Sequence, residues 1–379
     1  LINKGANTLD SMFISQWSDP DLGGAAGFTD DLVGCDTMPD GTFKSRSLGF
    51  VYNATNNDGG YGETPPALGY DFFQGPIVAG DTLGLVSFNK YINGTDPASA
   101  EETYNYMRGL QIDGSPTVDP FGVTTTYTVA GDPVSPVPGS WLDSSPADRR
   151  MMLSSGPFTM APGDSQEVTV AIVIGHCGDR LDAISAMRFN DEFAQIAYDK
   201  NFDLPSPPPQ PQVNVSVEDG EVRLSWDAAS RENYDEPGYA FEGYNVYQGH
   251  TVAGPWELVQ TYDENNGIRV IHDQVFDVAS CLLIPVFPVI EAQDVGVRFE
   301  HTITEDEVRG GPLFNGTEYF FAVTAYSQNP TGVPKVLENA QAVVRTIPQK
   351  PALGTDLATA SATPVEYLQK DTLRPPATD

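Results

Sequence analysis

The chain has 379 residues, enough for two or three domains that each bury a core of their own. Its 52 acidic and 20 basic side chains give a formal net charge of −32, which repels phosphate backbones and anionic membranes, so nucleic acid is excluded as a partner class. The acidic residues are dispersed among aromatic and β-branched residues, which predicts folded acidic domains and not a disordered acidic tail.

Cysteine is rare in this chain, with only Cys35, Cys177 and Cys281 present. Three widely spaced cysteines are too few for a disulfide scaffold, and their odd number leaves at least one unpaired unless a second chain supplies its partner. A Cys35–Cys177 bridge is compatible with the sequence but is not predicted by it.

No apolar run is long enough to span a membrane, because the longest, residues 281–290, is interrupted by Pro285 and Pro288. We therefore predict no membrane insertion. The chain begins at Leu1 without an initiator Met or a signal peptide, which we expect of a mature or trimmed fragment of a longer precursor.

Residues 1–203 have the composition of a β domain with long loops. Short apolar segments such as 12–17 and 47–52 alternate with stretches rich in Gly, Pro, Asn and Asp, which is typical of short strands in a sandwich-like fold. A turn at 161–164 precedes a nearly unbroken β-branched run at 167–175. The segment from Met151 to the turn and this run together predict a buried strand pair.

One helix is predicted at the end of this domain, over residues 179–201. Apolar residues recur there at helical spacing, and Asp179 is a suitable N-cap. Residues 204–211 are rich in proline, which cannot donate backbone hydrogen bonds and favours a stiff extended chain. We predict the domain linker at this segment.

The segment from about 206 to 348 resembles a fibronectin type III domain. Residues 222–226 with Trp226 match its B strand, residues 243–248 match its C strand, and Tyr319 stands where the family has its tyrosine corner. The resemblance implies an immunoglobulin-like β-sandwich over 212–348. The fold class that we predict is mostly β: a sandwich-like N-terminal domain with long loops and one closing helix, followed by this fibronectin type III-like sandwich with a long insertion.

The second domain departs from that family in a long insertion, about 263–312, which contains an apolar stretch. Extra strands that complete the same core would explain it, and so would an apolar patch held for a partner. Residues 349–379 read as an extended tail or linker whose short apolar piece could add as a strand to a neighbour. The candidate interface residues are Val275, Leu282, Leu283, Ile284, Val286, Phe287, Val365, Tyr367 and Leu368.

A wider resemblance covers most of the chain. The runs QWSDPDLGGAAGFTDDLVGCDT, YNATNNDGGYGETPPALGYDFFQGP and MMLSSGPFTMAPGDSQEV look like segments of multi-modular secreted proteins of Gram-negative bacteria that are exported through a C-terminal sorting domain. This resemblance implies an extracellular or cell-surface location and a modular architecture more than it implies an activity.

Residues 19–36 form the stretch that looks most like a site, because Asp and Gly are concentrated there. Calcium takes six to eight oxygen ligands at flexible geometry, and acidic loops with glycine at tight turns can supply them. The spacing does not match an EF-hand, and the ordinary alternative is that Asp, Asn and Gly simply form surface turns. The candidate calcium ligands are Asp19, Asp21, Asp30, Asp31, Asp36, Asn57 and Asp58.

Catalytic motifs are missing from the sequence: it contains no GxSxG, GxxxxGK, GxGxxG or HExxH pattern, and its four histidines lack zinc-ligand spacing. Aromatic residues between 17 and 73 could stack on sugars, although core packing is the commoner role of such residues. We therefore expect a non-enzymatic structural or adhesive surface protein with calcium-stabilised loops, working through protein contacts and able to assemble into a fibre or sheath. The alternative is a set of carbohydrate-binding and spacer modules of a secreted hydrolase.

Overall fold

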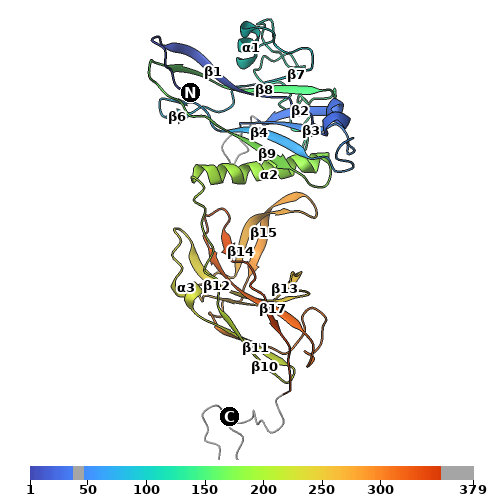
Figure 1. Cartoon of the computed structure of the whole chain (residues 1–379), viewed down its shortest axis with the longest axis vertical. Helices are drawn as coiled ribbons and strands as arrows, with labels where there is room; N and C mark the ends of the chain where they lie inside the picture. Colours follow the sequence, from blue (N-terminus) through green and yellow to red (C-terminus); the bar gives the residue numbers. More distant parts are fainter. Residues whose placement is uncertain (37–46, 351–379) are drawn as a thin grey trace, which may run out of the picture. The chain divides into compact units, whose positions relative to one another are not determined.

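The computed structural model describes residues 1–36 and 47–350, and the chain is mostly β, with antiparallel sheets and few helices (Figure 1). Two compact units are distinguished. The first contains Leu1–Leu204 and Asp273–Phe287, and the second contains Pro205–His272 and the residues from Pro288 onward.

The first unit has two main sheets. One has the strand order β1-β8-β7, and the other has the order β2-β3-β4-β9. A short hairpin, β5-β6, stands apart from them. The strands are β1 (Leu9–Ser18), β2 (Asp31–Asp36), β3 (Leu48–Asn53), β4 (Ala67–Gln74), β5 (Ile77–Val78), β6 (Asp81–Thr82), β7 (Ser87–Ile92), β8 (Arg149–Met160) and β9 (Thr169–Gly175).

Apolar side chains fill two layers of this unit. Phe88 and Leu153 from the first sheet pack with Phe72 from the second, and on the other face of the second sheet Phe50 packs with Met187 of helix α2 (Arg180–Asp199). Figure 1 shows α2 lying along that sheet. The helix approaches closely because Gly175 has no side chain: a Cβ there would lie 2.1 Å from the backbone nitrogen of Met187.

The predicted closing helix is confirmed in α2. The Asp179 side chain caps it by accepting hydrogen bonds from the backbone nitrogens of Leu181 and Asp182. The Asp182 side chain accepts a hydrogen bond from the Asp179 backbone nitrogen, which completes a capping box. A second helix, α1 (Ala100–Met107), was not predicted.

The prediction of a buried strand pair on either side of the 161–164 turn is wrong in two respects: β8 and β9 lie in different sheets, and one face of β9 is exposed. Ile172 and Ile174 are 66% and 60% exposed, whereas Val173 between them is buried. The reason is that β9 stands at the end of its sheet among the described strands and only one of its faces is covered, by α2. Alternate residues of a strand point to opposite faces, so a β-branched run does not by itself establish burial on both.

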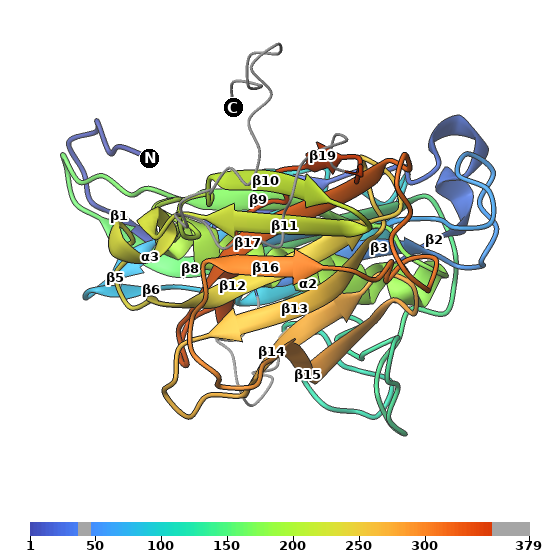
Figure 2. The same cartoon turned by 90° about the horizontal axis from the view of Figure 1, so that it is seen from below.

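The second unit also contains two antiparallel sheets. One has the order β10-β11-β16, with β11 between its neighbours in Figure 2, and the other has the order β13-β12-β17-β18 with β19 also pairing with β17. The elements are β10 (Val213–Glu218), β11 (Glu221–Trp226), α3 (Ala229–Glu232), β12 (Ala240–Gly249), β13 (Trp256–Asp263), β16 (Glu300–Ile303), β17 (Tyr319–Gln328), β18 (Val336–Glu338) and β19 (Val344–Thr346).

Both sheets of the second unit contribute to one core. Trp226 on β11 packs in a cluster with Tyr244 on β12 and Phe321 on β17, and all three are buried. The Tyr319 hydroxyl accepts a hydrogen bond from the backbone nitrogen of Phe314 at 2.9 Å. That bond fixes the turn that leads into β17.

The insertion contains a hairpin formed by β14 (Val270–Asp277) and β15 (Leu282–Glu291). Its tip, Asp273–Phe287, belongs to the first unit. A disulfide joins Cys177 to Cys281 in the tip, and Phe276 stacks on Phe189 of α2 with 5.1 Å between ring centroids. The domain prediction that kept the whole insertion 263–312 in the second domain therefore fails at the tip, because a covalent bond and aromatic packing hold the tip on α2.

The cysteine pairing differs from the bridge that the sequence left open. Cys177 pairs with Cys281, 104 residues away, and Cys35 is a free, buried cysteine that packs in the core between the two sheets of the first unit. No helix within residues 1–36 and 47–350 is long and apolar enough to cross a membrane.

The disulfide predicts a redox-dependent stability. Replacing Cys177 and Cys281 together by Ser should lower the free energy of unfolding by about 3 to 5 kcal/mol, because the bond closes a long loop in the unfolded chain. Differential scanning calorimetry with and without reductant measures this. Reductant should destabilise the wild-type chain and leave the double variant unchanged, and equal thermograms of the wild type under both conditions would contradict the pairing.

Candidate functional site

The Asp-rich stretch lies in the loop between β1 and β2, where it forms two short turns, η1 (Gly24–Ala26) and η2 (Phe28–Asp30). It packs against the loop between β3 and β4. A Cβ at Gly59 would lie 2.0 Å from the carbonyl oxygen of Ala26, and a Cβ at Gly60 would lie 2.3 Å from that of Gly23. Glycine is therefore required where the two backbones meet.

Three polar side chains are buried where these loops meet. Asp31 and Asn53 are 0% exposed and Asp58 is 2% exposed. Asp31 begins β2 and lies directly opposite Asn53, the last residue of β3, in the antiparallel register. Asp58 is held by a bridge of two backbone hydrogen bonds to Gly62. We call Asp30, Asp31, Asn53 and Asp58 the loop pocket.

Only part of the hydrogen-bonding capacity of the loop pocket is used. Asp31 Oδ2 accepts from the backbone nitrogen of Leu22 at 3.1 Å, and Asp58 Oδ1 accepts from the backbone nitrogens of Gly60 and Tyr61 at 2.6 and 2.7 Å. The Asn53 amide nitrogen donates to the carbonyl oxygens of Thr55 and Asn57. The buried oxygens that accept no hydrogen bond from any described residue are Asp30 Oδ1, Asp31 Oδ1, Asn53 Oδ1 and Asp58 Oδ2.

Electrostatics in the loop pocket disfavour ionised carboxylates. Burial, together with the charges of Asp30, Asp58 and Asp21, raises the pKa of Asp31 to about 8 despite its hydrogen bond from Leu22. Burial and the charge of Asp58 also raise the pKa of Asp30, against a hydrogen bond from Asn53. The charged neighbours that act on Asp30 and Asp31 are thus other carboxylates.

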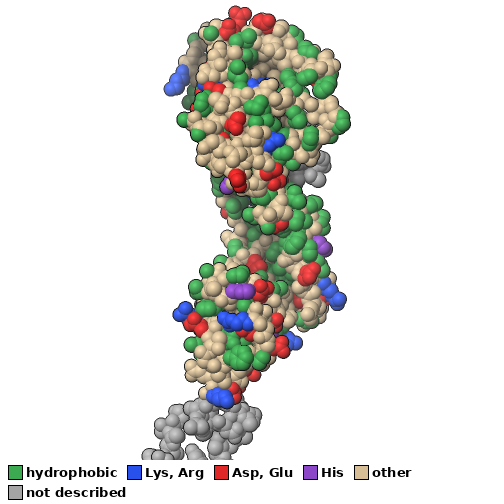
Figure 3. All heavy atoms as spheres, turned by 90° about the vertical axis from the view of Figure 1, so that its right-hand side faces the viewer, with side chains coloured by type: hydrophobic (Ala, Val, Ile, Leu, Met, Phe, Trp, Pro, Cys, Tyr) green, Lys and Arg blue, Asp and Glu red, His purple; other side chains and the backbone are tan. Residues whose placement is uncertain are grey.

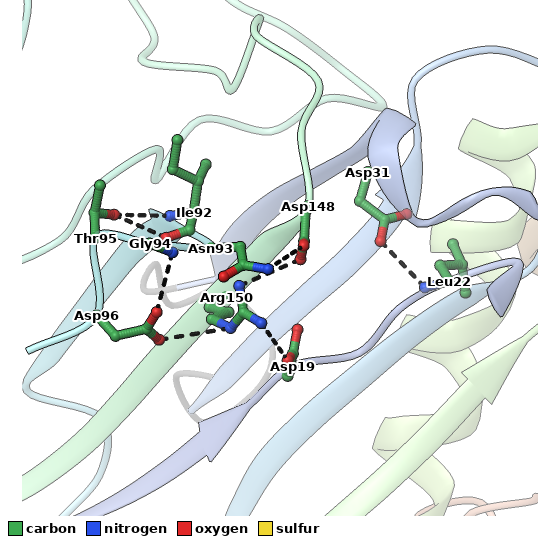
Figure 4. Close-up of polar contacts among 10 residues, drawn as sticks. All are labelled: Asp19, Leu22, Asp31, Ile92, Asn93, Gly94, Thr95, Asp96, Asp148 and Arg150. Carbon is green, nitrogen blue, oxygen red and sulfur yellow. Dashed lines mark hydrogen bonds and ion pairs between the residues drawn. The ribbon is translucent and has the colours of Figure 1, made fainter. Parts of the chain in front are cut away.

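A second acidic cluster is organised around Arg150 of β8. Its guanidinium pairs with Asp19 at 2.7 Å, with Asp148 at 3.4 Å and with Asp96 at 3.5 Å. Figure 4 shows Arg150 among these three carboxylates, whereas Asp31 is directed toward Leu22. Burial raises the pKa of Asp19, and the Arg150 charge opposes that rise. We call Asp19, Asp21, Asp96, Asp148 and Arg150 the Arg150 cluster.

Asp19, Asp21 and Asp148 of the Arg150 cluster bring three carboxylate oxygens within 4.8 Å of one another, a spacing compatible with a metal ion. Asp21 is exposed, and Asp19 and Asp148 are partly buried. Arg150 already provides a cation at this place. The spacing therefore has an explanation that needs no metal.

Two of the predicted calcium ligands lie in neither cluster. Asp36, at the far end of β2, accepts two hydrogen bonds from Arg188 of α2, at 2.6 and 2.8 Å. Asn57 is exposed, and its backbone oxygen accepts from Asn53 and Thr55. The structure thus divides the predicted set: Asp30, Asp31 and Asp58 lie in the loop pocket, and Asp19 and Asp21 lie in the Arg150 cluster.

Four residues of these clusters, Asn53, Asp96, Asp148 and Arg150, were not predicted as site residues from the sequence. Asn53 follows the predicted apolar segment 47–52 and gave no acidic signal, although strand pairing places it opposite Asp31. Asp148 and Arg150 lie more than 100 residues from Asp19 in the chain, so only the pairing of β1 with β8 brings them near it.

The predicted interface residues of the hairpin are largely exposed. Leu282, Leu283, Val286 and Phe287 are 57%, 40%, 67% and 42% exposed, and Val275 and Ile284 are half-buried. Val275 also lines an open hollow of about 490 Å³ with His176, Phe189 and Phe276. Val365, Tyr367 and Leu368 lie outside the described residues.

The aromatic residues that might have formed a sugar-binding face do not share one. Tyr52, Tyr70 and Phe72 are buried in the core of the first unit, whereas Trp17 and Tyr61 are 49% and 55% exposed. Acidic side chains are dispersed over the face shown in Figure 3, where basic side chains are fewer.

No protein-family model matches the chain, and no curated protein matches it.

The Arg150 cluster predicts a specific cost for losing its cation. Arg150→Ala should lower the free energy of unfolding by roughly 1 to 3 kcal/mol, less than for a fully buried pair, because the carboxylates are partly solvated. Urea unfolding followed by circular dichroism measures this cost. The matched control is Arg223→Ala, which removes a half-exposed arginine 3.8 Å from Glu221 and should cost less than about 0.5 kcal/mol. Equal effects of the two substitutions would contradict the role given to Arg150.

Proposed function

We propose that this chain is a non-enzymatic extracellular structural or adhesive surface protein that works through protein contacts and has calcium-stabilised loops. The observation that carries the proposal is the hairpin tip. Four large apolar side chains between Leu282 and Phe287 are exposed on it. Soluble proteins rarely leave neighbouring apolar side chains exposed unless a partner covers them.

The disulfide supports the extracellular part of the proposal. Disulfides persist in oxidising compartments and are rare in the reducing cytosol. The Cys177–Cys281 bond fixes the base of the exposed apolar segment, since Cys281 directly precedes Leu282. A partner would meet a tip that is already ordered, which lowers the entropic cost of association.

The strand order of the second unit supports a fibronectin type III-like module. A three-stranded sheet, β10-β11-β16, faces a sheet built on β13-β12-β17, and Trp226 is buried between them. The Tyr319 hydroxyl bonds to the backbone five residues upstream, as a tyrosine corner would. Such modules are spacers and binding platforms and need no catalytic residues of their own, and fold alone does not assign a function.

We propose a second copy of this chain as the partner of the hairpin tip. Contacts that join different surfaces of successive copies generate open polymers, so the assembly would be a fibre or sheath. The alternative function, carbohydrate-binding and spacer modules of a secreted hydrolase, is supported by the exposure of Trp17 and Tyr61. Binding to a panel of insoluble polysaccharides, lost on Trp17→Ala, would favour that alternative.

The hairpin tip predicts the effect of charge on self-association. In the double variant Leu282→Lys and Val286→Lys, two charges enter one face of β15, so the association constant should fall at least about tenfold through lost apolar burial. Sedimentation velocity over a series of protein concentrations measures the association, and electron microscopy shows whether fibres form.

The matched control is Val137→Lys, because Val137 is 66% exposed in the same unit and lies outside the hairpin. It should leave the association unchanged. A wild-type chain that stays monomeric at every concentration, or a double variant that associates like the wild type, would contradict the role of the hairpin tip.

A further inference from the structure

The two acidic clusters of the first unit differ in how their charge is balanced. In the Arg150 cluster a guanidinium lies within 3.5 Å of three carboxylates. In the loop pocket the described neighbours are backbone nitrogens and an asparagine amide. Arg180 is the basic side chain nearby, and its guanidinium donates to the Asn53 carbonyl oxygen at 3.5 Å and lies over the Tyr52 ring.

The free oxygens of the loop pocket belong to side chains that are almost completely buried. Asp31, Asn53 and Asp58 are at most 2% exposed, and each retains one oxygen without a hydrogen bond from the described residues. Buried polar atoms of native proteins nearly always have a partner, and an unpaired buried carboxylate is especially costly. Three such oxygens, together with the buried Oδ1 of the half-buried Asp30, indicate a missing positive partner.

The position of Asp58 shows where that partner would lie. Its free oxygen, Oδ2, is directed at the Asp-rich loop: a Cβ on Gly23 or Gly27 would lie 2.3 or 2.1 Å from it. The same loop continues into Asp30 and Asp31, whose carboxylates are close enough for the Asp58 charge to act on both. The two glycines keep this space clear of side chains.

We propose that a calcium ion binds in the loop pocket, with the carboxylates of Asp30, Asp31 and Asp58 and the amide oxygen of Asn53 as its ligands. All four are hard oxygen donors, which calcium prefers, and backbone carbonyls of the two loops can add to their number. Ligands on opposite sides of a calcium ion lie about 5 Å apart, so the oxygens need not cluster as tightly as those of Asp19, Asp21 and Asp148.

Calcium fits this pocket better than magnesium does. Magnesium requires short octahedral contacts and retains several of its waters, whereas calcium accepts six to eight ligands at variable distances from flexible loops. The loop pocket is buried and is formed by two irregular loops. A calcium ion in the loop pocket would link the β1–β2 loop to the β3–β4 loop. These loops already contact each other through close backbone packing at Gly59 and Gly60.

The test is the thermal stability of the full chain in excess EGTA and in 10 mM CaCl2, with Asp31→Asn and Asp58→Asn as the variants. Calcium should raise the wild-type melting temperature by about 5 to 10 °C if its dissociation constant is near the 10⁻⁴ M found in extracellular modules. Both variants should lose that shift. In EGTA they should melt at or above the wild-type temperature, because asparagine replaces a buried carboxyl group that has no positive partner, and this shows that they are folded.

The matched control is Asp148→Asn, which makes the same chemical change in the Arg150 cluster and should keep the calcium shift. Isothermal titration with CaCl2 should give one site in the wild type and at least tenfold weaker binding in each loop-pocket variant. The proposal is overturned if the wild type shows neither shift nor heat. It is equally overturned if the shift survives in Asp31→Asn and Asp58→Asn, if only Asp148→Asn abolishes it, or if 10 mM MgCl2 gives an equal shift.

This site does not depend on the self-association proposed for the hairpin tip. A chain that binds calcium and remains a monomer would contradict the assembly proposal alone. The site rests on the calcium-stabilised loops of the proposed function, so a chain that assembles without binding calcium would contradict the loop-pocket proposal and those loops but not the assembly proposal.

Discussion

Burial of like charges is the constraint on which the first unit depends. Removing a carboxylate from water costs several kcal/mol unless a counter-charge or hydrogen bonds replace the lost hydration. Asp31 and Asp58 are buried by the backbone around them, because Asp31 begins β2 opposite Asn53 and Asp58 is fixed by its bridge to Gly62. Glycines at 23, 27, 59 and 60 let the loops approach closely. The first unit thus buries the carboxylates of the loop pocket without an ion pair to any described basic side chain.

A disulfide is the second long-range contact that holds the first unit together. Cys177 precedes α2 and Cys281 lies at the hairpin tip, so the disulfide holds a segment from far along the chain against the helix that covers the second sheet. Phe276 adds aromatic packing on Phe189. A calcium ion in the loop pocket and the disulfide before α2 would both stabilise the end of this sheet where Arg180 donates to the Asn53 carbonyl oxygen. Both suit the calcium-rich, oxidising conditions outside a cell.

Local sequence patterns were enough to predict local structure, whereas contacts between distant segments became known only from the structure. The spacing of apolar residues after Asp179 was enough for α2, and the density of Asp and Gly was enough to nominate Asp30, Asp31 and Asp58. The same composition also nominated Asp36, which lies about 17 Å along β2 from Asp31 and pairs with Arg188 of the helix. Arg188 as the partner of Asp36 and Cys281 as the partner of Cys177 cannot be predicted from residue spacing, since both contacts depend on the packing of distant segments. The exposed face of β9 was missed for the same reason.

The central claim is that the loop pocket is a calcium site, and anomalous diffraction from crystals grown with calcium or soaked with terbium tests it most directly. The account predicts one strong anomalous peak between Asp31 and Asp58, about 2.3 to 2.6 Å from the free carboxylate oxygens. A peak among Asp19, Asp21 and Asp148 instead, or hydrogen-bonded carboxylic acids in the loop pocket with no peak in the presence of calcium, would contradict it.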